Sequence, residues 1–529
     1  MTKASLEKQN RDLRIKFDNL TIKSEIKEIA LRDDIGALER SLSGKDKAIG
    51  MLQKEIASLT LLIEKLQIEN KELKQELEKT RKEVQRLTSI ISKNSSNSSK
   101  PPSTDGYHKI PNSREKSQRP SGGQKGHPGR RLQLPENLDD LVEMGLAEKR
   151  IVDHTDGSEE YTSRWTLDLE VKTIVTEHRF PKGEALPNGM ENEVIYGDNI
   201  KAITVLLSTE GIIAQERLAA FLKELTGGVL SPSDATVENF LTLFARKLPN
   251  ELEAIENNLL NNSVMGVDDT PLNCTEKPEY GQPGETPVLK TAEKTSFSVT
   301  LRNYSNELST LYTVNPQKDK AGVDRDGILP RYTGTLSHDH ESKFYNYGIA
   351  HATCGEHLSR DLQGLYELEK CPWANQMRSF VLGMNDHKKT DLKNGITACN
   401  PDVLSEYEKQ YDALLVEGWL AHSKLNDHDL GYNELRAMLN RLQNYKDCYL
   451  LFMRDYSKPF TNNLSERDLR SSKTKQKVSG CFRSWKGVKN YAANSSFIST
   501  AKKRGLNLLD SITSVFKGIP VFSDCPVGM

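Results

Sequence analysis

Acidic residues stand at three places in the second half of the chain where the residue pattern changes. One strand-like run leads into the neighbouring acids Asp268 and Asp269, and another leads into Asp339. A third acid, Glu466, lies in a segment whose pattern predicts the start of a helix. Carboxylates that follow neighbouring strands would lie at the same edge of a sheet. Three such carboxylates could bind two Mg²⁺ ions, which prefer oxygen ligands. Two such ions about 4 Å apart stabilise the attacking and leaving oxygens of a phosphoryl transfer, so the arrangement is compatible with that chemistry.

Each acid also has a purely structural interpretation. Asp268 and Asp269 could form a turn at the end of a strand, and Asp339 could cap the helix that follows. Glu466 stands three residues after Asn463, which is the spacing of a helix capping arrangement. Alternation along a strand does not choose between the two neighbouring aspartates. The residue types alone therefore leave both the metal site and its first ligand open.

Three residues at steps of three, His351, Cys354 and His357, read as H-x₂-C-x₂-H. Such steps spread side chains around a helix, and a fourth ligand is missing. Packing, with His357 near substrate phosphate, is therefore favoured over a metal site. The seven cysteines are widely spaced without a C-x-x-C pair, which predicts free thiols in a reducing cytoplasm. Since no cysteine precedes Cys274, a zinc site around the expected small β unit is not favoured, and we expect no zinc in this protein.

A strongly basic segment begins beside Glu466. Residues 467–504 contain eleven Lys or Arg and one acid, a net charge of +10, with aromatic residues between them. A run of one sign next to a candidate catalytic acid favours contact with the DNA backbone, although most charge runs are solvated surfaces. The candidate DNA contacts here are Arg467, Arg470, Lys473, Lys475, Lys477 and Arg483.

A second basic segment lies near the N-terminal end. Residues 93–131 contain nine Lys or Arg and two acids, a net charge of +7, among many Ser, Pro and Gly residues. This composition predicts a flexible segment that neutralises phosphates through Lys125, Arg130 and Arg131. The alternative is a soluble linker. The net charge of the whole chain is only −1, so the residues outside the two basic segments carry a net negative charge.

Heptad spacing dominates residues 31–91. Fifteen of eighteen seam positions are apolar, and the exceptions are Lys45, Asn70 and Thr80. Ile and Val recur at a positions and Leu at d positions, and Asn70 occupies an a position, which together favour a parallel two-stranded coiled coil. A single surface helix is the alternative, but it would leave a long apolar stripe in water. We therefore expect at least a dimer.

Between the coil and the acidic motifs, two further units are expected. Alternating residues in 150–181 predict a small β unit. Residues 196–248 read as helical, with Gly227-Gly228 after one helix. Ser231-Pro232-Ser233-Asp234 is expected to open the next helix with a capping residue, a proline at the first helical position and an acidic first turn. Helix, short turn and capped helix are compatible with a helix-turn-helix, although most such pairs are ordinary helical hairpins. With 529 residues and a mean hydropathy of −0.61, the chain is expected to have several domains and no membrane span.

Four motifs of the second half occur together. They are Asp268-Asp269-Thr270-Pro271, Asp339 ahead of Phe344-Tyr345-Asn346-Tyr347, the trio Cys354, His357 and Arg360, and Asn462-Asn463 followed by Glu466 and Arg467. With the coil, the glycine-rich stretch 122–129 and the segments 175–179 and 196–197, they resemble the insertion-sequence sixty-six family of bacterial DDE transposases. The resemblance covers nearly the whole chain. Asp269 replaces the usual Glu of the first motif.

The resemblance implies a multidomain transposase with an RNase H-like α/β catalytic domain that carries an α-helical insertion. It implies that Asp268, Asp339 and Glu466 form a DDE triad holding two Mg²⁺ or Mn²⁺ ions. The enzyme would cut a phosphodiester at each element end and join the freed 3′-hydroxyl to target DNA. The expected partners are element-end and target DNA, a second copy of the chain and small accessory proteins, in the bacterial cytoplasm at the nucleoid. The alternative is a catalytically inactive, dimeric DNA-binding regulator derived from a transposase.

These expectations divide the chain into consecutive units. In order, they are a coiled-coil helix (1–92), a basic flexible linker (93–135), a small β unit in a zinc-finger-like position without cysteine ligands (136–190), a helical DNA-binding segment with a possible helix-turn-helix (191–261), the first part of the RNase H-like core (262–361), a helical insertion (362–456), and the catalytic Glu helix with the basic C-terminal region (457–529).

Overall fold

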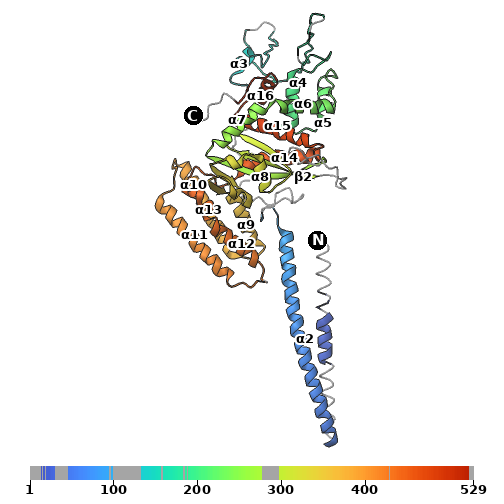
Figure 1. The fold of residues 1–529 in the computed structure, drawn as a ribbon, viewed down its shortest axis with the longest axis vertical. Coiled ribbons are helices and arrows are strands. Elements are labelled where there is room, and N and C mark those ends of the chain that lie inside the picture. The colour runs from blue at the N-terminus through green and yellow to red at the C-terminus, as the bar shows by residue number, and fades with distance from the viewer. Residues whose placement is uncertain are drawn as a thin grey trace.

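The structure, a computed structural model, describes residues 14, 16–17, 19–29, 46–94, 97–98, 133–155, 159–182, 185–187, 189–276, 297–427 and 429–522. It shows a mixed α/β body from which a long helical arm projects (Figure 1). None of the described helices is long and apolar enough to cross a membrane. The six described cysteines are free thiols, and Cys525 lies outside the described residues.

A five-stranded mixed sheet lies at the centre of the body, in the order β3-β2-β1-β4-β5. Neighbouring strands are antiparallel from β1 to β3, whereas β4 is parallel to β1 and β5 is parallel to β4. The strands are β1 (Val264–Cys274), β2 (Phe297–Ser305), β3 (Thr310–Asn315), β4 (Thr335–His338) and β5 (Ala350–Thr353).

The first strand is longer than the sequence pattern predicts. We expected it to end before Asp268, but β2 pairs with β1 from Gly266 to Cys274 and extends it. β4, by contrast, pairs only with the first three residues of β1. Asp268 and Asp269 therefore lie within a strand and do not form a turn. The four-residue strand β5 was not predicted, because a strand this short leaves little pattern.

Helices cover both faces of the sheet. On one face, α14 (Asn463–Ser479) and α15 (Trp485–Lys503) pack over a cluster that includes Leu272, Leu301 and Leu469. On the other face, Met265 and Tyr304 share a buried cluster with residues of α7 (Pro249–Leu260) and α8 (Lys320–Asp326). Two short 3₁₀ helices, η2 (Leu329–Arg331) and η3 (Ser342–Asn346), flank β4. The catalytic candidates thus lie between a sheet and the helix layer formed by α14 and α15.

A group of helices separates β5 from α14 and has its own buried core. Trp373, Tyr411 and Leu439 belong to this core, and the Trp373 indole donates to the carbonyl of Leu414. In Figure 1 these helices form a separate lobe beside the sheet. They are α9 (Gly355–Glu367), α10 (Pro372–Lys393), α11 (Pro401–His422), α12 (Tyr432–Asn444) and α13 (Lys446–Arg454).

Helices also precede the sheet. Ser233 caps α6 by accepting a hydrogen bond from the Thr236 backbone N–H, and both Gly227 and Gly228 have positive φ in the turn before it. The glycine turn lies where the sequence predicts it. The helix starts later than expected, because α6 begins at Asp234 and Pro232 precedes the Ser233 cap instead of being the first helical residue. The helices of this segment are α4 (Asp198–Thr209), α5 (Gln215–Leu225), α6 (Asp234–Lys247) and α7, and α16 (Leu508–Phe516) packs against α4.

The β unit expected in residues 136–190 is not seen. The described part of this segment contains α3 (Leu138–Glu143) and no strand. Of its alternating apolar side chains, Leu169 and Ile174 are more than 80% exposed, and Leu167 and Val171 are 53% and 47% exposed. Alternation predicts a strand only where another strand and a core are available to pair with it, and the described residues of this segment supply neither.

The arm consists of α2 (Asp46–Ser92) and the helical residues 19–29, which run alongside it in the opposite direction (Figure 1). The amide of Asn70 donates to Ser24 Oγ at 3.0 Å. Predicted seam residues such as Ile63 and Leu66 are half-buried, whereas Leu73 is exposed. The arm joins the body through Lys82, which pairs with Asp429, and Ser89, which donates to Glu369. Contact with a second chain stays a prediction.

Candidate active site

Asp268 and Asp339 occupy equivalent positions relative to two adjacent parallel strands, since Asp268 lies within β1 and Asp339 directly follows β4. Gly266 of β1 pairs with Ser337 of β4, and each aspartate stands two residues further along its chain. Burial raises the pKa of Asp268 well above its usual value, and the neighbouring carboxylates of Asp339, Asp269 and Glu466 add to the rise. Burial likewise raises the pKa of Asp339 to about 7, with Glu341 and Asp269 contributing. The structure therefore brings acids together where negative charge is costly.

Asp269 points to the opposite face of β1 and lies among basic groups. Its side chain is only 2% exposed, and its carboxylate lies 2.6 Å from Lys343 Nζ, 3.2 Å from Lys318 Nζ and 3.6 Å from Arg302. Arg302, which is fully buried, also pairs with Asp326. By contrast, no basic side chain among the described residues forms an ion pair with Asp268. The two neighbouring aspartates, which the sequence could not tell apart, thus have different surroundings.

The start of α14 is fixed closely against β1. A Cβ atom on Gly266 would lie 2.4 Å from Ser465 Oγ, so only glycine permits this approach. The amide of Asn462 donates to the carbonyl of Val267 at 2.7 Å, and the amide of Asn303 donates to the carbonyl of Ser465 at 3.1 Å. These bonds place the first turn of α14, and with it Glu466, over the face of β1 that carries Asp268.

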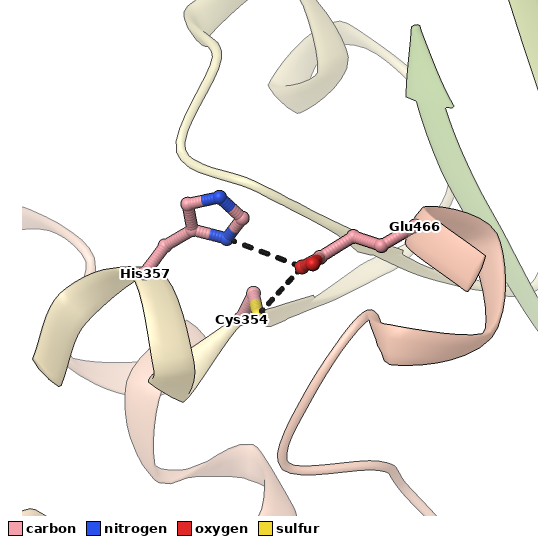
Figure 2. Close-up of side chains that lie close together, drawn as sticks. All are labelled: Cys354, His357 and Glu466. Atoms are coloured by element: carbon pink, nitrogen blue, oxygen red, sulfur yellow. Dashed lines mark hydrogen bonds and ion pairs between the residues drawn. The ribbon is translucent and has the colours of Figure 1, made fainter. Parts of the chain in front are cut away.

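Glu466 contacts the beginning of α9 (Figure 2). Its Oε1 atom lies 3.5 Å from His357 Nδ1 and 3.8 Å from Cys354 Sγ, and Oε2 lies 4.0 Å from Arg360. Cys354 is almost fully buried, and its sulfur accepts a hydrogen bond from the backbone N–H of Asn462. Burial raises the pKa of the Cys354 thiol to about 12, and Glu466 adds to this rise. The motif Cys354, His357 and Arg360 is therefore brought to Glu466 by the fold.

His351 lies apart from this group, because its Nδ1 atom is 3.1 Å from His338 Nε2. The H-x₂-C-x₂-H spacing therefore does not describe one cluster. Cys354, His357 and Glu466 do form one cluster, since their ligand atoms all lie within 4.8 Å of one another. Among the described residues, this is the group of three acids, histidines or cysteines that lies so close together. The sequence could not reveal this group, since Glu466 is 112 residues beyond Cys354.

Asp468 anchors the next turn of α14. Its Oδ2 atom accepts hydrogen bonds from Ser305, Thr310 and Lys503, each at 2.7 or 2.8 Å. The Asp468 and Lys503 side chains are about 10% exposed. This ion pair ties α14 to α15 and to the β2–β3 turn. Its role was not evident in the sequence, where Lys503 is one of many basic residues.

The predicted DNA contacts are not alike in the structure. Arg467, Arg470, Lys477 and Arg483 are exposed, and Lys473 is half-buried. Lys475 is buried, and its amine donates to the carbonyls of Ser208 and Ile213. Burial lowers the pKa of Lys475. Lys475 therefore supports the packing of α14 on the end of α4, which differs from the expected phosphate contact. The candidates Lys125, Arg130 and Arg131 lie outside the described residues.

Comparison with protein-family models gives two matches. Residues 193–490, more than half of the 529-residue chain, match the family described as Transposase IS66 family. Residues 51–133 match a family of unknown function (DUF6444). No curated protein matches the chain.

Solved structures of the Mos1 transposase show a weak likeness. The Mos1 strand transfer complex is 14% identical, with a TM-score of 0.11 over 52% of this chain and 82% of the Mos1 chain. The pre-cleavage Mos1 transpososome is 15% identical, with a TM-score of 0.10 over 50% and 80%. The Mos1 mariner paired end complex with Mn is 14% identical, with a TM-score of 0.11 over 50% and 81%. Similarity at this level carries no conclusion about this chain.

The family match spans the elements that build the site. It begins before α4 and ends within α15, and so includes β1, β4 and α14 with Asp268, Asp339 and Glu466. The chain belongs to the IS66 family of transposases.

Proposed function

We propose that the chain is a DDE-type DNA transposase that uses Asp268, Asp339 and Glu466 to bind two Mg²⁺ or Mn²⁺ ions. The observation that carries this proposal is the placement of Asp268, within β1, beside Asp339, directly after β4, with raised pKa values for both carboxylates. Two acids held together in a half-buried site repel each other, and a divalent cation would remove that cost. Strongly perturbed acids in a cleft are typical of functional sites.

The surrounding atoms fit hard cations. Besides the carboxylates, the oxygens Asn303 Oδ1, Asn462 Oδ1 and Ser465 Oγ are buried without a hydrogen-bond partner among the described residues. Buried oxygens of this kind call for a partner, and Mg²⁺ binds oxygen ligands and water. We assign the first ligand position to Asp268 over Asp269, because three basic groups already neutralise Asp269.

Bound divalent ions would activate the attacking oxygen and stabilise the leaving oxygen in two successive reactions, cleavage at an element end and strand transfer into target DNA. The chain's own residues hold and orient the DNA around this site. Arg467 and Arg470 are exposed on α14 directly after Glu466, where they can neutralise phosphates next to the scissile bond. Lys318 and Lys343 keep Asp269 out of the ligand set.

The strand order supports an RNase H-like catalytic core. Three antiparallel strands in the order β3-β2-β1 are continued by the parallel strands β4 and β5, and the third acid follows a helical insertion. In this proposal, α2 pairs two protomers so that two element ends are held together, in the bacterial cytoplasm at nucleoid DNA. Small accessory proteins would complete the assembly. Symmetric pairing of protomers matches the symmetry of two inverted DNA ends.

A strand-transfer assay with pre-cut element-end DNA and Mg²⁺ tests the proposal. We expect Asp268→Asn, Asp339→Asn and Glu466→Gln each to lower the rate by at least about a hundredfold, as loss of a group that stabilises transition-state charge does. Glu417→Gln, on the exposed side of α11, is the matched control and should keep full activity. Equal activity of the wild type and Glu466→Gln would remove Glu466 from the triad. DNA binding without any strand transfer would favour the inactive regulator.

A further inference from the structure

We propose that Cys354, His357 and Glu466 form a binding site for a soft divalent cation, Zn²⁺, which shares Glu466 with the proposed catalytic site. The three side chains come from two elements: Cys354 and His357 from the start of α9, and Glu466 from the first turn of α14 (Figure 2). They offer one sulfur, one nitrogen and one oxygen, the three donor types that Zn²⁺ accepts in proteins.

The distances match tetrahedral coordination. Zn²⁺ binds sulfur at about 2.3 Å and nitrogen or oxygen at about 2.0–2.2 Å, so tetrahedral ligand atoms lie roughly 3.4–3.6 Å apart. The carboxylate oxygen of Glu466 lies 3.5 Å from His357 Nδ1 and 3.8 Å from Cys354 Sγ, and all three ligand atoms lie within 4.8 Å of one another. Shifts well below 1 Å would bring the first two distances to the expected values. Three protein ligands leave a fourth position for water or a DNA oxygen.

The partners of these ligand atoms are arranged for metal binding. Among the described residues, the buried His357 Nδ1 atom has no hydrogen-bond partner, and it faces Glu466. The sulfur of Cys354 stands at the N-terminal end of α9 and accepts a hydrogen bond from the Asn462 backbone N–H at 3.3 Å. On binding, the thiol proton leaves to solvent and a sulfur–zinc bond takes its place.

The site lies close to the protein surface, with His357 Nδ1 itself buried. The side chains of His357 and Glu466 are 17% and 18% exposed, while Cys354 forms the closed inner end. The donor set also selects the ion. Mg²⁺ and Ca²⁺ bind oxygen ligands and gain little from a thiolate, whereas sulfur and imidazole favour Zn²⁺. The two proposed sites therefore differ in chemistry: oxygen donors around Asp268 and Asp339, and mixed donors beside α9.

Sharing Glu466 makes the two sites compete. When Glu466 binds Zn²⁺ with Cys354 and His357, it is not available to the ions held by Asp268 and Asp339. Zn²⁺ should then inhibit Mg²⁺-dependent strand transfer. This regulatory part rests on the proposed function, while the Zn²⁺ site itself does not.

The binding site is tested with the full-length, metal-free chain titrated with Zn²⁺ against a chromogenic chelator. We expect Cys354→Ser and His357→Gln each to weaken binding about tenfold or more, the size of effect that altered ligand shells produce. Cys371→Ser is the matched control, because Cys371 precedes α10 as Cys354 precedes α9, but outside the cluster. Unchanged Zn²⁺ affinity in both variants would overturn the proposal.

Co²⁺ provides a second readout that reports sulfur directly. The wild type and Cys371→Ser should show the near-ultraviolet thiolate-to-cobalt absorption, and Cys354→Ser should lack it. If Cys354→Ser does not fold, the His357→Gln variant tests the site instead. It keeps the Cys354 thiol and should bind Co²⁺ more weakly than the wild type. An absorption that survives in Cys354→Ser, or is absent from the wild type, contradicts the assignment.

Strand-transfer activity distinguishes the proposed Zn²⁺ site from the proposed transposase function. Zn²⁺ should inhibit strand transfer by the wild type, and inhibition of His357→Gln should need about tenfold more Zn²⁺. If Zn²⁺ binds as expected but Mg²⁺ supports no strand transfer, the proposed function fails and the Zn²⁺ site stands. If strand transfer depends on the triad and Zn²⁺ does not bind, the Zn²⁺ site fails alone.

Discussion

The Oε1 atom of Glu466 lies 3.5 Å from His357 Nδ1, and the same carboxylate contributes to the raised pKa of Asp268. Glu466 therefore stands between two groups of partners, one on α9 and one on the sheet. Its position depends on how tightly α14 is fixed to β1 and β2. The predictions below test this attachment, the charge of the acidic site and the assignment of the basic residues.

The metal-free protein should become less stable as pH rises from about 4 to about 7. The folded-state pKa of Asp339 is about 7, above the unfolded value near 3.8, so its contribution is fully present below pH 3.8 and is lost as pH approaches 7. The slope from one such group is at most about 1.4 kcal/mol per pH unit. Denaturant unfolding at several pH values measures it.

Asp339→Asn should flatten this dependence, and Mg²⁺ should restore stability to the wild type at pH 7 but not to the variant. A wild type whose stability rises between pH 4 and pH 7, with no difference in Asp339→Asn, would contradict the raised pKa of Asp339.

Gly266→Ala should lower both stability and activity. The added Cβ would lie 2.4 Å from Ser465 Oγ and 2.8 Å from Asn462 Oδ1, so α14 must move away from β1. Overpacking of this kind costs about 1–3 kcal/mol. Thermal unfolding and strand transfer measure the two effects. Gly383→Ala, in α10 with open space around it, is the control and should be neutral or slightly stabilising.

Lys503→Met should lower the free energy of unfolding by about 3–5 kcal/mol, because it leaves Asp468 buried without its positive partner. The neighbouring Lys502→Met removes only an exposed pair with Glu210 and should cost less than about 1 kcal/mol. Urea unfolding of both variants makes the comparison. Similar values for the two would show that the Asp468–Lys503 pair does not fix α14.

Lys475→Gln and Lys477→Gln should behave differently although both residues lie in one basic run. Lys475→Gln should lower stability, since its buried amine satisfies the carbonyls of Ser208 and Ile213. Lys477→Gln should leave stability unchanged, weaken DNA binding and reduce the slope of binding against salt by about one. A changed salt slope with normal stability in Lys475→Gln would restore Lys475 as a phosphate contact.

Several features could be predicted from the sequence because their causes are local. The turn at Gly227-Gly228 and a serine cap on the helix that follows depend on neighbouring residues. The structure shows both, with the cap at Ser233, after the expected first helical residue Pro232. The heptad spacing of α2 and the acidic motifs are likewise contained in short segments. The expected β unit is not seen in the described residues of 136–190. Alternation describes one strand, whereas a sheet needs a partner strand, and the described part of this segment provides none.

The amino-acid sequence by itself determined which acids, cysteines and basic residues are available, and through its motifs it determined the family. Only the tertiary structure decided what each of them faces. Strand alternation separates Asp268 from Asp269, but the pairing of β1 with its neighbours decides which of them meets Lys343 and Arg302. Burial against α4 gives Lys475 a structural role. Cys354 and His357 meet Glu466 because β5, α9 and α14 converge, and contacts across more than a hundred residues leave no local signal in the sequence.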